Sequence, residues 1–243
     1  MSSSGELHIG TSGWNYDHWL GTFYPEELRS SQLFEYYRSR FSTVEINNTF
    51  YQLPQDSTFL NWKEQAPEGF IYTVKASRYI THMKKLKDPR ESLERFLQAV
   101  SRLGEALGPV LFQLPPNWHF NADRLRSFLD MLPDEHRYAF ELRDPSWIND
   151  EAFEILRTRN VAFCIYEFAG RLSPEKVTAD FVYVRLHGPG DAYQGDYSGE
   201  TLRKWAEKIE QWLSQDLDVF CYFDNDQLGY APKNALELTN LLD

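Results

Sequence analysis

The sequence repeats one pattern eight times: a short run of β-branched and aromatic residues ends in polar side chains, and a stretch with helical spacing follows nearly every run. The runs cover residues 7–12, 43–51, 70–75, 110–115, 138–143, 161–167, 181–187 and 219–226. A closed barrel of alternating strands and helices has this order, and it brings the carboxyl ends of its strands to one mouth. The length of 243 residues is close to the roughly 250 that such a barrel needs. We therefore predict an α/β fold, a single (β/α)8 TIM barrel with short loops, in one domain over residues 1–243.

Helical spacing of apolar residues marks most stretches between the runs. The clearest case begins at Asp88-Pro89, a capping residue followed by proline, and ends at Gly108-Pro109. Further helices are predicted over residues 31–41, 57–66, 121–132, 150–159, 198–214 and 232–242. Two longer connections, residues 76–87 and 188–197, follow strand ends. Barrel enzymes place substrate loops there, so we expect both to line the site and the second to be a mobile lid.

Composition limits the classes of partner. A formal net charge of -11 disfavours a general nucleic-acid coat or a protein that binds anionic membranes, although a local basic pocket is compatible with it. The first residues do not resemble a signal peptide, and no apolar stretch approaches the ~20 residues that span a bilayer. Cys164 and Cys221 lie inside strand runs, where cysteine is usually a small buried residue. These features predict a cytoplasmic protein with two reduced, buried thiols.

Strand parity selects candidate site residues, because side chains two apart on a strand share a face. In the run 43–51, Val44 and Ile46 must meet the helices, so Glu45 is expected to point into the barrel. In the last run the parity is ambiguous between Asp224 and Asn225. The candidate site residues point into the barrel, end a strand or lie in a nearby loop. They are Trp14, Glu45, Asn47, Tyr51, Lys75, His82, Gln113, Glu141, Arg143, Trp147, Arg185, His187, Asp224 and Asn225.

Two interpretations of the charged members stay open. Buried ion pairs such as Glu45 with Lys75, or Glu141 with Arg143, occur in barrel interiors for structural reasons alone. Desolvating several charges is costly, however, and a core alone would use Val, Ile and Leu. In the functional interpretation, arginine and lysine bind a phosphate or carboxylate, while carboxylates and histidine act as general acid and base. The catalytic candidates are then Glu45, Glu141 and His187, and the others bind substrate.

Other chemistries have weaker support. A metal site would combine Glu141, Glu167, His187 and Asp224 or Asp226 from successive strands, but the usual spacings of metal ligands are missing, so we predict neither metal nor cofactor. No glycine-rich phosphate loop separates a strand from a helix. Ser12 lacks the context of a nucleophile elbow and is expected to cap or orient.

Several motifs occur in order along almost the whole chain. They are Thr11-Ser12-Gly13-Trp14, Trp19-Leu20-Gly21, Phe23-Tyr24-Pro25, Val44-Glu45-Ile46-Asn47-Asn48-Thr49-Phe50-Tyr51, Gln113-Leu114-Pro115-Pro116, Glu141-Leu142-Arg143, Tyr183-Val184-Arg185-Leu186-His187-Gly188, Tyr222-Phe223-Asp224-Asn225-Asp226 and Asn234-Ala235. Together they resemble domain-of-unknown-function family 72, the YecE-like family. The resemblance implies a single-domain barrel similar to the sugar isomerase and apurinic endonuclease barrels in a bacterial cytoplasm, and no particular reaction. Glu167 stands where relatives often carry aspartate, which puts an acidic role there in doubt.

The leading functional prediction is an enzyme acting by acid–base chemistry on a small anionic or sugar-phosphate-like substrate at the carboxyl ends of the strands. An oxyanion is expected between Lys75, Arg143 and Arg185. One alternative is a metal-dependent phosphodiester hydrolase related to the apurinic endonuclease barrels. The other is a non-catalytic module that binds a ligand or a protein partner through aromatic side chains.

Overall fold

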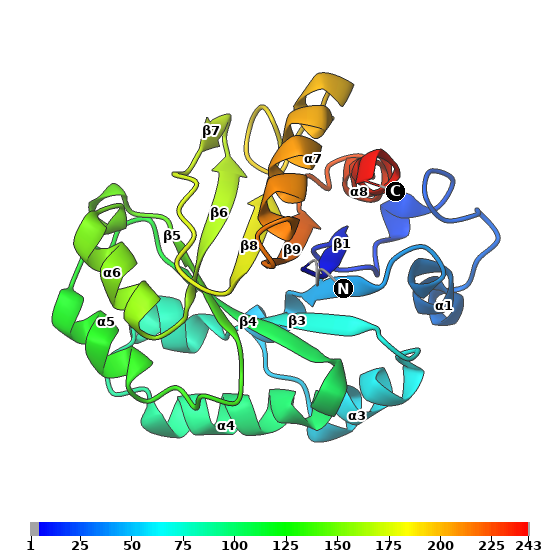
Figure 1. Ribbon diagram of the computed structural model, residues 1–243. Coiled ribbons are helices and arrows are strands. Elements are labelled where there is room, and N and C mark those ends of the chain that lie inside the picture. The colour runs from blue at the N-terminus through cyan, green and yellow to red at the C-terminus, as the bar shows by residue number, and fades with distance from the viewer. Residues whose placement is uncertain (1–4, 243) are drawn as a thin grey trace. The chain divides into compact units, whose positions relative to one another are not determined.

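The computed structural model describes residues 5–242 and shows strands alternating with helices along the chain (Figure 1). The strands are β1 (Leu7–Thr11), β2 (Thr43–Ile46), β3 (Ile71–Lys75), β4 (Leu107–Leu114), β5 (Tyr138–Leu142), β6 (Ala162–Phe168), β7 (Arg171–Leu172), β8 (Phe181–Leu186) and β9 (Asp218–Phe223). The helices are α1 (Leu33–Arg38), α2 (Asn48–Tyr51), α3 (Asp56–Gln65), α4 (Arg90–Val100), α5 (Ala122–Leu129), α6 (Asp150–Thr158), α7 (Gly199–Leu213) and α8 (Tyr230–Leu242). Short 3-10 turns are η1 (Asp17–Trp19), η2 (Ser30–Gln32), η4 (Ser101–Ala106) and η5 (Pro145–Trp147), and η3 (Tyr79–Met83) is a π-helical turn. Within the described residues the fold is of the TIM-barrel type, with eight parallel strands, as predicted.

The described residues form two compact units. Unit 1 contains residues 5–45, 165–175 and 181–242, and unit 2 contains residues 46–164 and 176–180. Strands β2 and β6 each contribute residues to both units.

In unit 1, β9 pairs with β1 and β8, and these strands are parallel. Arg185 of β8 lies opposite Tyr222 of β9, and Leu186 lies opposite Phe223, so Arg185 and Tyr222 share one face of the sheet. Helices α7 and α8 both contact β9 (Figure 1). The ring of Tyr197, just before α7, packs against Phe223 with 5.8 Å between centroids. The helices therefore cover the Phe223 face, and Arg185 belongs to the opposite face.

In unit 2, β4 pairs with β3 and β5, and β5 pairs with β6, all in parallel. Gln113 of β4 lies opposite Glu141 of β5, and Phe112 lies opposite Phe140. The ring of Phe128 on α5 packs against both phenylalanines, at 5.1 and 6.0 Å between centroids. Gln113 and Glu141 therefore share the face turned away from α5.

Local sequence signals explain where the helices begin. Asn121, Asn149 and Ser198 each precede a helix, and each side chain accepts a hydrogen bond from the backbone N–H three residues later. The apolar stripe predicted for the helix after Pro89 is confirmed over α4, but the helix ends at Val100 and not at Gly108, since η4 follows it and Gly108 lies in β4. The buried members of the stripe in α4 are Leu93, Phe96, Leu97, Ala99 and Val100.

The run 43–51 differs from the prediction of one continuous strand. Strand β2 ends at Ile46, and α2 begins at Asn48. Thr49 Oγ1 donates a hydrogen bond to Lys75 O at 2.7 Å, which holds the chain in this turn. Short polar side chains compete in this way with a β-ladder, so the parity argument does not extend to Asn47 and Tyr51.

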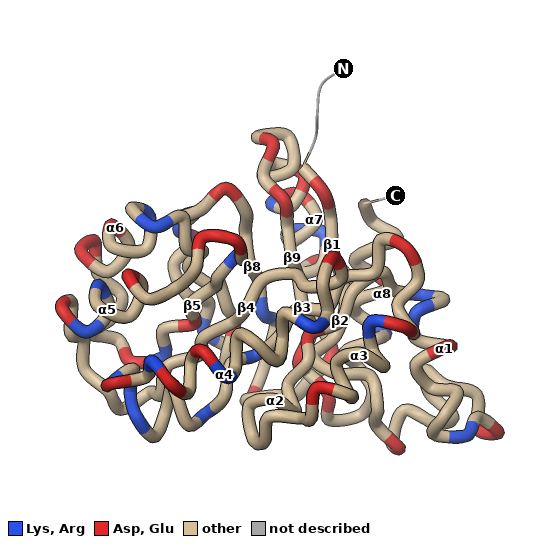
Figure 2. The backbone as a smooth tube through the Cα atoms, turned by 90° about the horizontal axis from the view of Figure 1, so that it is seen from below, with Lys and Arg blue, Asp and Glu red and all other residues tan. Residues whose placement is uncertain are grey.

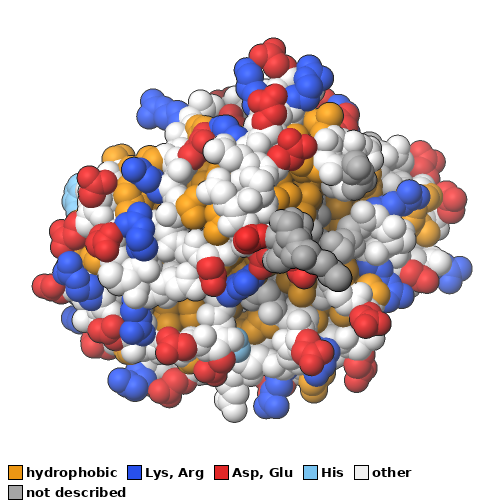
Figure 3. All heavy atoms as spheres, in the orientation of Figure 1, with side chains coloured by type: hydrophobic (Ala, Val, Ile, Leu, Met, Phe, Trp, Pro, Cys, Tyr) orange, Lys and Arg blue, Asp and Glu red, His pale blue; other side chains and the backbone are white. Residues whose placement is uncertain are grey.

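The charged side chains of unit 2 are mixed in sign. Figure 2 shows acidic and basic residues along α4, α5 and α6, and the surface over α5 and α6 in Figure 3 carries both signs. None of the helices in residues 5–242 is long and apolar enough to cross a membrane.

Candidate functional site

Arg185 and Glu45 form the centre of a buried polar network in unit 1. Arg185 Nη2 donates to Glu45 Oε1 at 2.8 Å and Nε donates to Oε2 at 3.0 Å, and both side chains are 0% exposed. Tyr183 OH donates to Glu45 Oε2 at 2.6 Å, and Ser12 Oγ donates to Oε1 at 2.7 Å. These donors stabilise the Glu45 carboxylate as an ion although it is removed from water.

His187 and Asp224 extend this network. His187 Nδ1 lies 2.9 Å from Asp224 Oδ2, which also accepts a hydrogen bond from Arg185 Nη2 at 3.1 Å. Arg185 Nη1 lies 3.2 Å from His187 Nε2. Because a guanidinium group can only donate, Nε2 is the acceptor in this contact. The rings of Phe168 and Tyr193 pack edge-on against His187 at 5.6 and 5.3 Å between centroids.

In this structure Arg185 links buried groups of unit 1 to one another, which is a structural role. Its donors reach Glu45, Asp224, Ser12 and His187, and the side chain has no exposure to solvent. Arg185 and His187 share one face, as strand parity predicts. After β9, Asp224 and not Asn225 is the residue that contacts both of them. The catalytic roles of Glu45 and His187, and an oxyanion bound to Arg185, stay predictions.

A second polar group lies in unit 2, and we refer to it as the unit 2 cluster: Lys75, His82, Gln113, Glu141 and Arg143, together with Asn47 from the turn that Thr49 bonds to the backbone of Lys75. Lys75 pairs with Leu111, two residues before Gln113, so Lys75 shares the sheet face of Gln113 and Glu141. Glu141 is 0% exposed and accepts a hydrogen bond from Arg143 Nε. Carboxylate, amide and cationic groups thus come together on one face of the unit 2 sheet.

His82 joins this cluster from the π-helical turn η3. Lys75 Nζ lies 4.4 Å above the centroid of the Phe50 ring, and the ring of His82 packs edge-on against the same phenylalanine at 5.0 Å. Burial is the main cause that lowers the pKa of His82 from 6.5 to about 4, and the charges of Lys75, Arg78 and Arg143 lower it further. His82 is therefore neutral at pH 7, when it can accept or donate a proton at a nearby group.

Two side-chain oxygens of the unit 2 cluster are buried without a hydrogen-bond partner in the described part of the chain. They are Asn47 Oδ1 and Gln113 Oε1. Gln113 as a whole is 8% exposed. A buried acceptor without a donor costs about 1–3 kcal/mol, which a ligand hydroxyl group would offset by donating to it.

The other predicted binding residues have different surroundings. Trp147 is fully buried, and Nε1 donates to a backbone carbonyl at 2.5 Å. Trp14 packs against an α1 ring at 5.2 Å, and Asn225 Nδ2 donates to Asn234 Oδ1 at 2.9 Å. Tyr51 is 72% exposed. The contacts of the first three are those of packing residues, and their predicted role in binding stays untested.

The sequence-based selection missed a group around Asp226 in unit 1. Trp19 Nε1 donates to Asp226 Oδ1 at 2.5 Å, and His18 Nε2 lies 3.1 Å from Oδ2. Burial raises the pKa of Asp226 to about 6, although the bond from Trp19 and the imidazole of His18 act in the opposite direction. Asp226 ends the eighth run and Trp19 belongs to a motif, so the residues were visible in the sequence but their pairing was not.

The metal alternative has no ligand group to support it within residues 5–242. No set of three or more histidine, cysteine, aspartate or glutamate side chains is placed there to hold a metal ion. Glu167, one of the predicted ligands, is half-buried, and this burial raises its pKa above the ordinary value.

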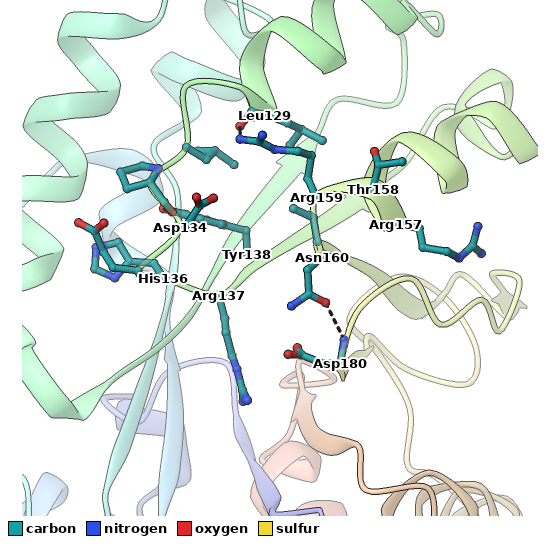
Figure 4. Close-up of a pocket in the computed structure, with 14 residues that line it drawn as sticks. Leu129, Asp134, His136, Arg137, Tyr138, Arg157, Thr158, Arg159, Asn160 and Asp180 are labelled. Carbon is teal, nitrogen blue, oxygen red and sulfur yellow. Dashed lines mark hydrogen bonds between the residues drawn. The ribbon is translucent and has the colours of Figure 1, made fainter.

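Unit 2 contains a hollow of about 560 Å³, and Figure 4 draws the residues that line it. It lies where the chain enters β5 and β6, since Tyr138 and Asn160 line it. Arg159 Nη2 donates to Leu129 O at 3.1 Å, and Asn160 Oδ1 accepts from Asp180 N at 2.9 Å. Both polar groups are therefore hydrogen-bonded within the protein. Residues at the amino ends of barrel strands generally contribute to stability and not to catalysis, so we assign this hollow no catalytic role.

Comparisons with known proteins agree with the fold and with the family that the motifs resemble. The family model described as protein of unknown function DUF72 matches residues 8–243. UPF0759 protein YecE of Escherichia coli K12 is 32% identical, over 93% of this chain and 89% of YecE. UPF0759 protein YunF of Bacillus subtilis is 27% identical, over 98% and 95%. A solved DUF72 family protein from Thermotoga maritima superposes with a TM-score of 0.88 at 30% identity, over 98% of this chain and 99% of that one.

A DUF72 family protein from Enterococcus faecalis has the same fold, with a TM-score of 0.80 at 20% identity over 99% of this chain and 98% of that one. The match of the family model extends over nearly the whole chain, and both solved relatives agree with it in fold. On this evidence the chain belongs to the DUF72 family.

Proposed function

We propose that the protein is an enzyme that binds a small anionic, hydroxylated substrate, such as a sugar phosphate, at the unit 2 cluster and acts on it by acid–base chemistry. The observation that carries this proposal is the pair of buried amide oxygens without partners, Asn47 Oδ1 and Gln113 Oε1, in a cluster that also holds Lys75 and Arg143. Sugar hydroxyl groups donate hydrogen bonds to amide oxygens, and phosphate binds to ammonium and guanidinium groups.

The cations of the cluster suit an anionic group. Lys75 is 9% exposed, and the side chain of Arg143 is 7% exposed. Charges with so little exposure act in a medium of lower dielectric constant than water, where their attraction for an anion is stronger. The bond from Arg143 to Glu141 orients the guanidinium before a ligand arrives.

The acid–base step is assigned to His82 and Glu141. Thr81 Oγ1 lies 2.9 Å from His82 Nδ1, and Nε2 has no hydrogen-bond partner among the described residues. The neutral imidazole of His82 can remove one proton from the substrate at Nε2. The Glu141 carboxylate can remove or return a proton at another position of the substrate. In this proposal Glu45 and His187 support the fold of unit 1, and their own catalytic roles remain the alternative.

Titration calorimetry with inorganic phosphate and ribose 5-phosphate tests the binding part. We expect Lys75→Met to weaken phosphate binding about 10- to 100-fold, because a hydrogen bond to a charged group is worth about 1.5–3 kcal/mol. Gln113→Leu should weaken ribose 5-phosphate and leave inorganic phosphate unchanged. Lys63→Met, an exposed lysine of α3, is the control. No binding to the wild type, or equal affinity in Lys75→Met, would contradict the site.

Turnover is tested separately by following a panel of sugar phosphates by NMR with the wild type and with His82→Asn. Conversion by the wild type that is lost in the variant, at unchanged affinity, supports the acid–base role. Tight binding without conversion of any panel member would favour a non-catalytic binding module.

A further inference from the structure

Unit 2 contains another hollow, of about 500 Å³, between the end of α2, the turn η3 and the start of α4. We call it the Tyr79 pocket. The residues that matter for its chemistry are Ser77, Tyr79, Lys84, Glu91, Ser92 and Arg95. Its lining shares no residue with the unit 2 cluster, so it is a separate candidate site. Its volume is in the range of pockets that hold small molecules, about 300–1,000 Å³.

The pocket combines an aromatic face with cationic groups. Tyr79 is 44% exposed, and Lys84 Nζ lies 5.4 Å from the centroid of its ring. The side chain of Arg95 makes no hydrogen bond or ion pair with any residue in the range 5–242. An exposed ring stacks on planar ligands, and an arginine binds phosphate through two parallel hydrogen bonds.

The segment beside the pocket is held in a costly backbone conformation. Three residues after η3, none of them glycine, have positive φ angles: Lys85 at 48°, Leu86 at 60° and Asp88 at 43°. Each costs about 1–3 kcal/mol and persists only where the surroundings fix it. Leu86 is buried and its N–H donates to Ile80 O at 3.0 Å, while Lys84 Nζ donates to Asp88 O at 3.0 Å. π-Helical turns such as η3 and strained segments are both frequent at functional sites.

We infer that the Tyr79 pocket binds a planar aromatic ring that carries a phosphate group, in the manner of a nucleoside monophosphate. The base stacks on Tyr79, and the phosphate binds to Arg95 and Lys84. Glu91 and the hydroxyl group of Ser77 or Ser92 are the partners for the ribose hydroxyls. Because Lys84 is already fixed by the strained segment, its ordering costs little when the ligand binds.

Titration calorimetry of Lys75→Met, in which the unit 2 cluster is weakened, with AMP, adenosine and ribose 5-phosphate separates the parts of the ligand at the Tyr79 pocket. We expect AMP to bind more tightly than either fragment. Arg95→Gln should weaken AMP about tenfold or more, the usual effect of losing a charge-assisted hydrogen bond, and should leave adenosine unchanged. Arg90→Gln is the matched control on the same helix, since Arg90 is exposed and lies 3.9 Å from Glu94 Oε1.

The aromatic contact has its own pair of variants. Tyr79→Ala should weaken AMP and adenosine roughly tenfold, as loss of base stacking does, while Tyr79→Phe should retain the affinity because the ring is kept. These variants are made in the Lys75→Met background, because Lys75 does not line the Tyr79 pocket and its removal weakens the phosphate site of the proposed function. Absence of AMP binding, equal affinity for AMP and ribose 5-phosphate, or equal losses in Arg95→Gln and Arg90→Gln would each overturn the inference.

Discussion

Arg185 Nη2 lies 2.8 Å from Glu45 Oε1, and neither side chain has any exposure to solvent. Taking both ions out of water is costly, and their attraction together with the bonds from Tyr183 and Ser12 compensates for it. Removal of Arg185 would leave the buried Glu45 carboxylate without this cation, and removal of Glu45 would leave the buried Arg185 charge with Asp224 as its carboxylate partner. The pair is therefore expected to matter for stability whatever the catalytic role of either residue.

The first prediction concerns this pair. Glu45→Gln should lower the free energy of unfolding by up to about 3–5 kcal/mol, because the buried Arg185 charge loses one of its two carboxylate partners and keeps Asp224. Arg185→Met together with Glu45→Gln should cost less than the sum of the single changes, since both charges are then gone. Urea unfolding measures these values. Glu154→Gln, which breaks an exposed pair with Arg157, should cost less than about 1 kcal/mol. Similar losses in Glu45→Gln and Glu154→Gln would contradict the structural role.

The second prediction concerns the connection 188–197, which the sequence predicts to be a mobile lid. Gly188 has φ +113°, and a Cβ there would lie 2.1 Å from Gln194 O, whereas a Cβ at Gly190 would meet nothing within 4 Å. Gly188→Ala should therefore destabilise the protein by about 1–3 kcal/mol or more, and Gly190→Ala should change stability by about 0.5 kcal/mol or less. Thermal unfolding of the two variants gives the comparison. Equal melting temperatures would mean that the packing at Gly188 is not maintained in solution.

The third prediction concerns the thiols. Cys164 and Cys221 are both buried, and burial raises the pKa of Cys221 far above its ordinary value. Since the thiolate is the reactive form, both cysteines should resist a disulfide reagent in the native protein and react at once in denaturant. Reagent uptake measured with and without guanidinium provides the test. Rapid labelling of either thiol in the native state would show that its strand opens.

Much of the fold and part of the candidate site follow from local patterns. Alternation along β8 and β5 places Arg185 and Glu141 on the faces that parity predicts. The helical stripe of α4 is likewise a local pattern. These features depend on residues near each other in the chain, and for that reason the sequence alone predicts them.

The remaining features depend on contacts between distant segments. Trp19 and Asp226 are 207 residues apart, and no spacing rule connects a loop indole to a carboxylate after the last strand. The turn after Ile46 depends on a bond from Thr49 to the backbone of Lys75, which local propensity does not reveal. Which charge pairs with which, such as Glu45 with Arg185, is decided by packing in three dimensions.

The fourth prediction uses the shifted titration of Asp226. Burial raises its pKa in the folded protein from 3.8 to about 6. Between these values the unfolded chain has already lost this proton while the folded protein still holds it, so rising pH favours the unfolded state until about pH 6. Asp226→Asn cannot titrate and keeps an oxygen that accepts the bond from Trp19. The stability of the wild type relative to Asp226→Asn should therefore fall between about pH 4 and pH 6 and stay constant above it. Urea unfolding across this range measures the difference, with Asp123→Asn, whose side chain is 99% exposed, as the control for charge removal. Parallel pH profiles for the wild type and Asp226→Asn would show that Asp226 does not titrate in this range.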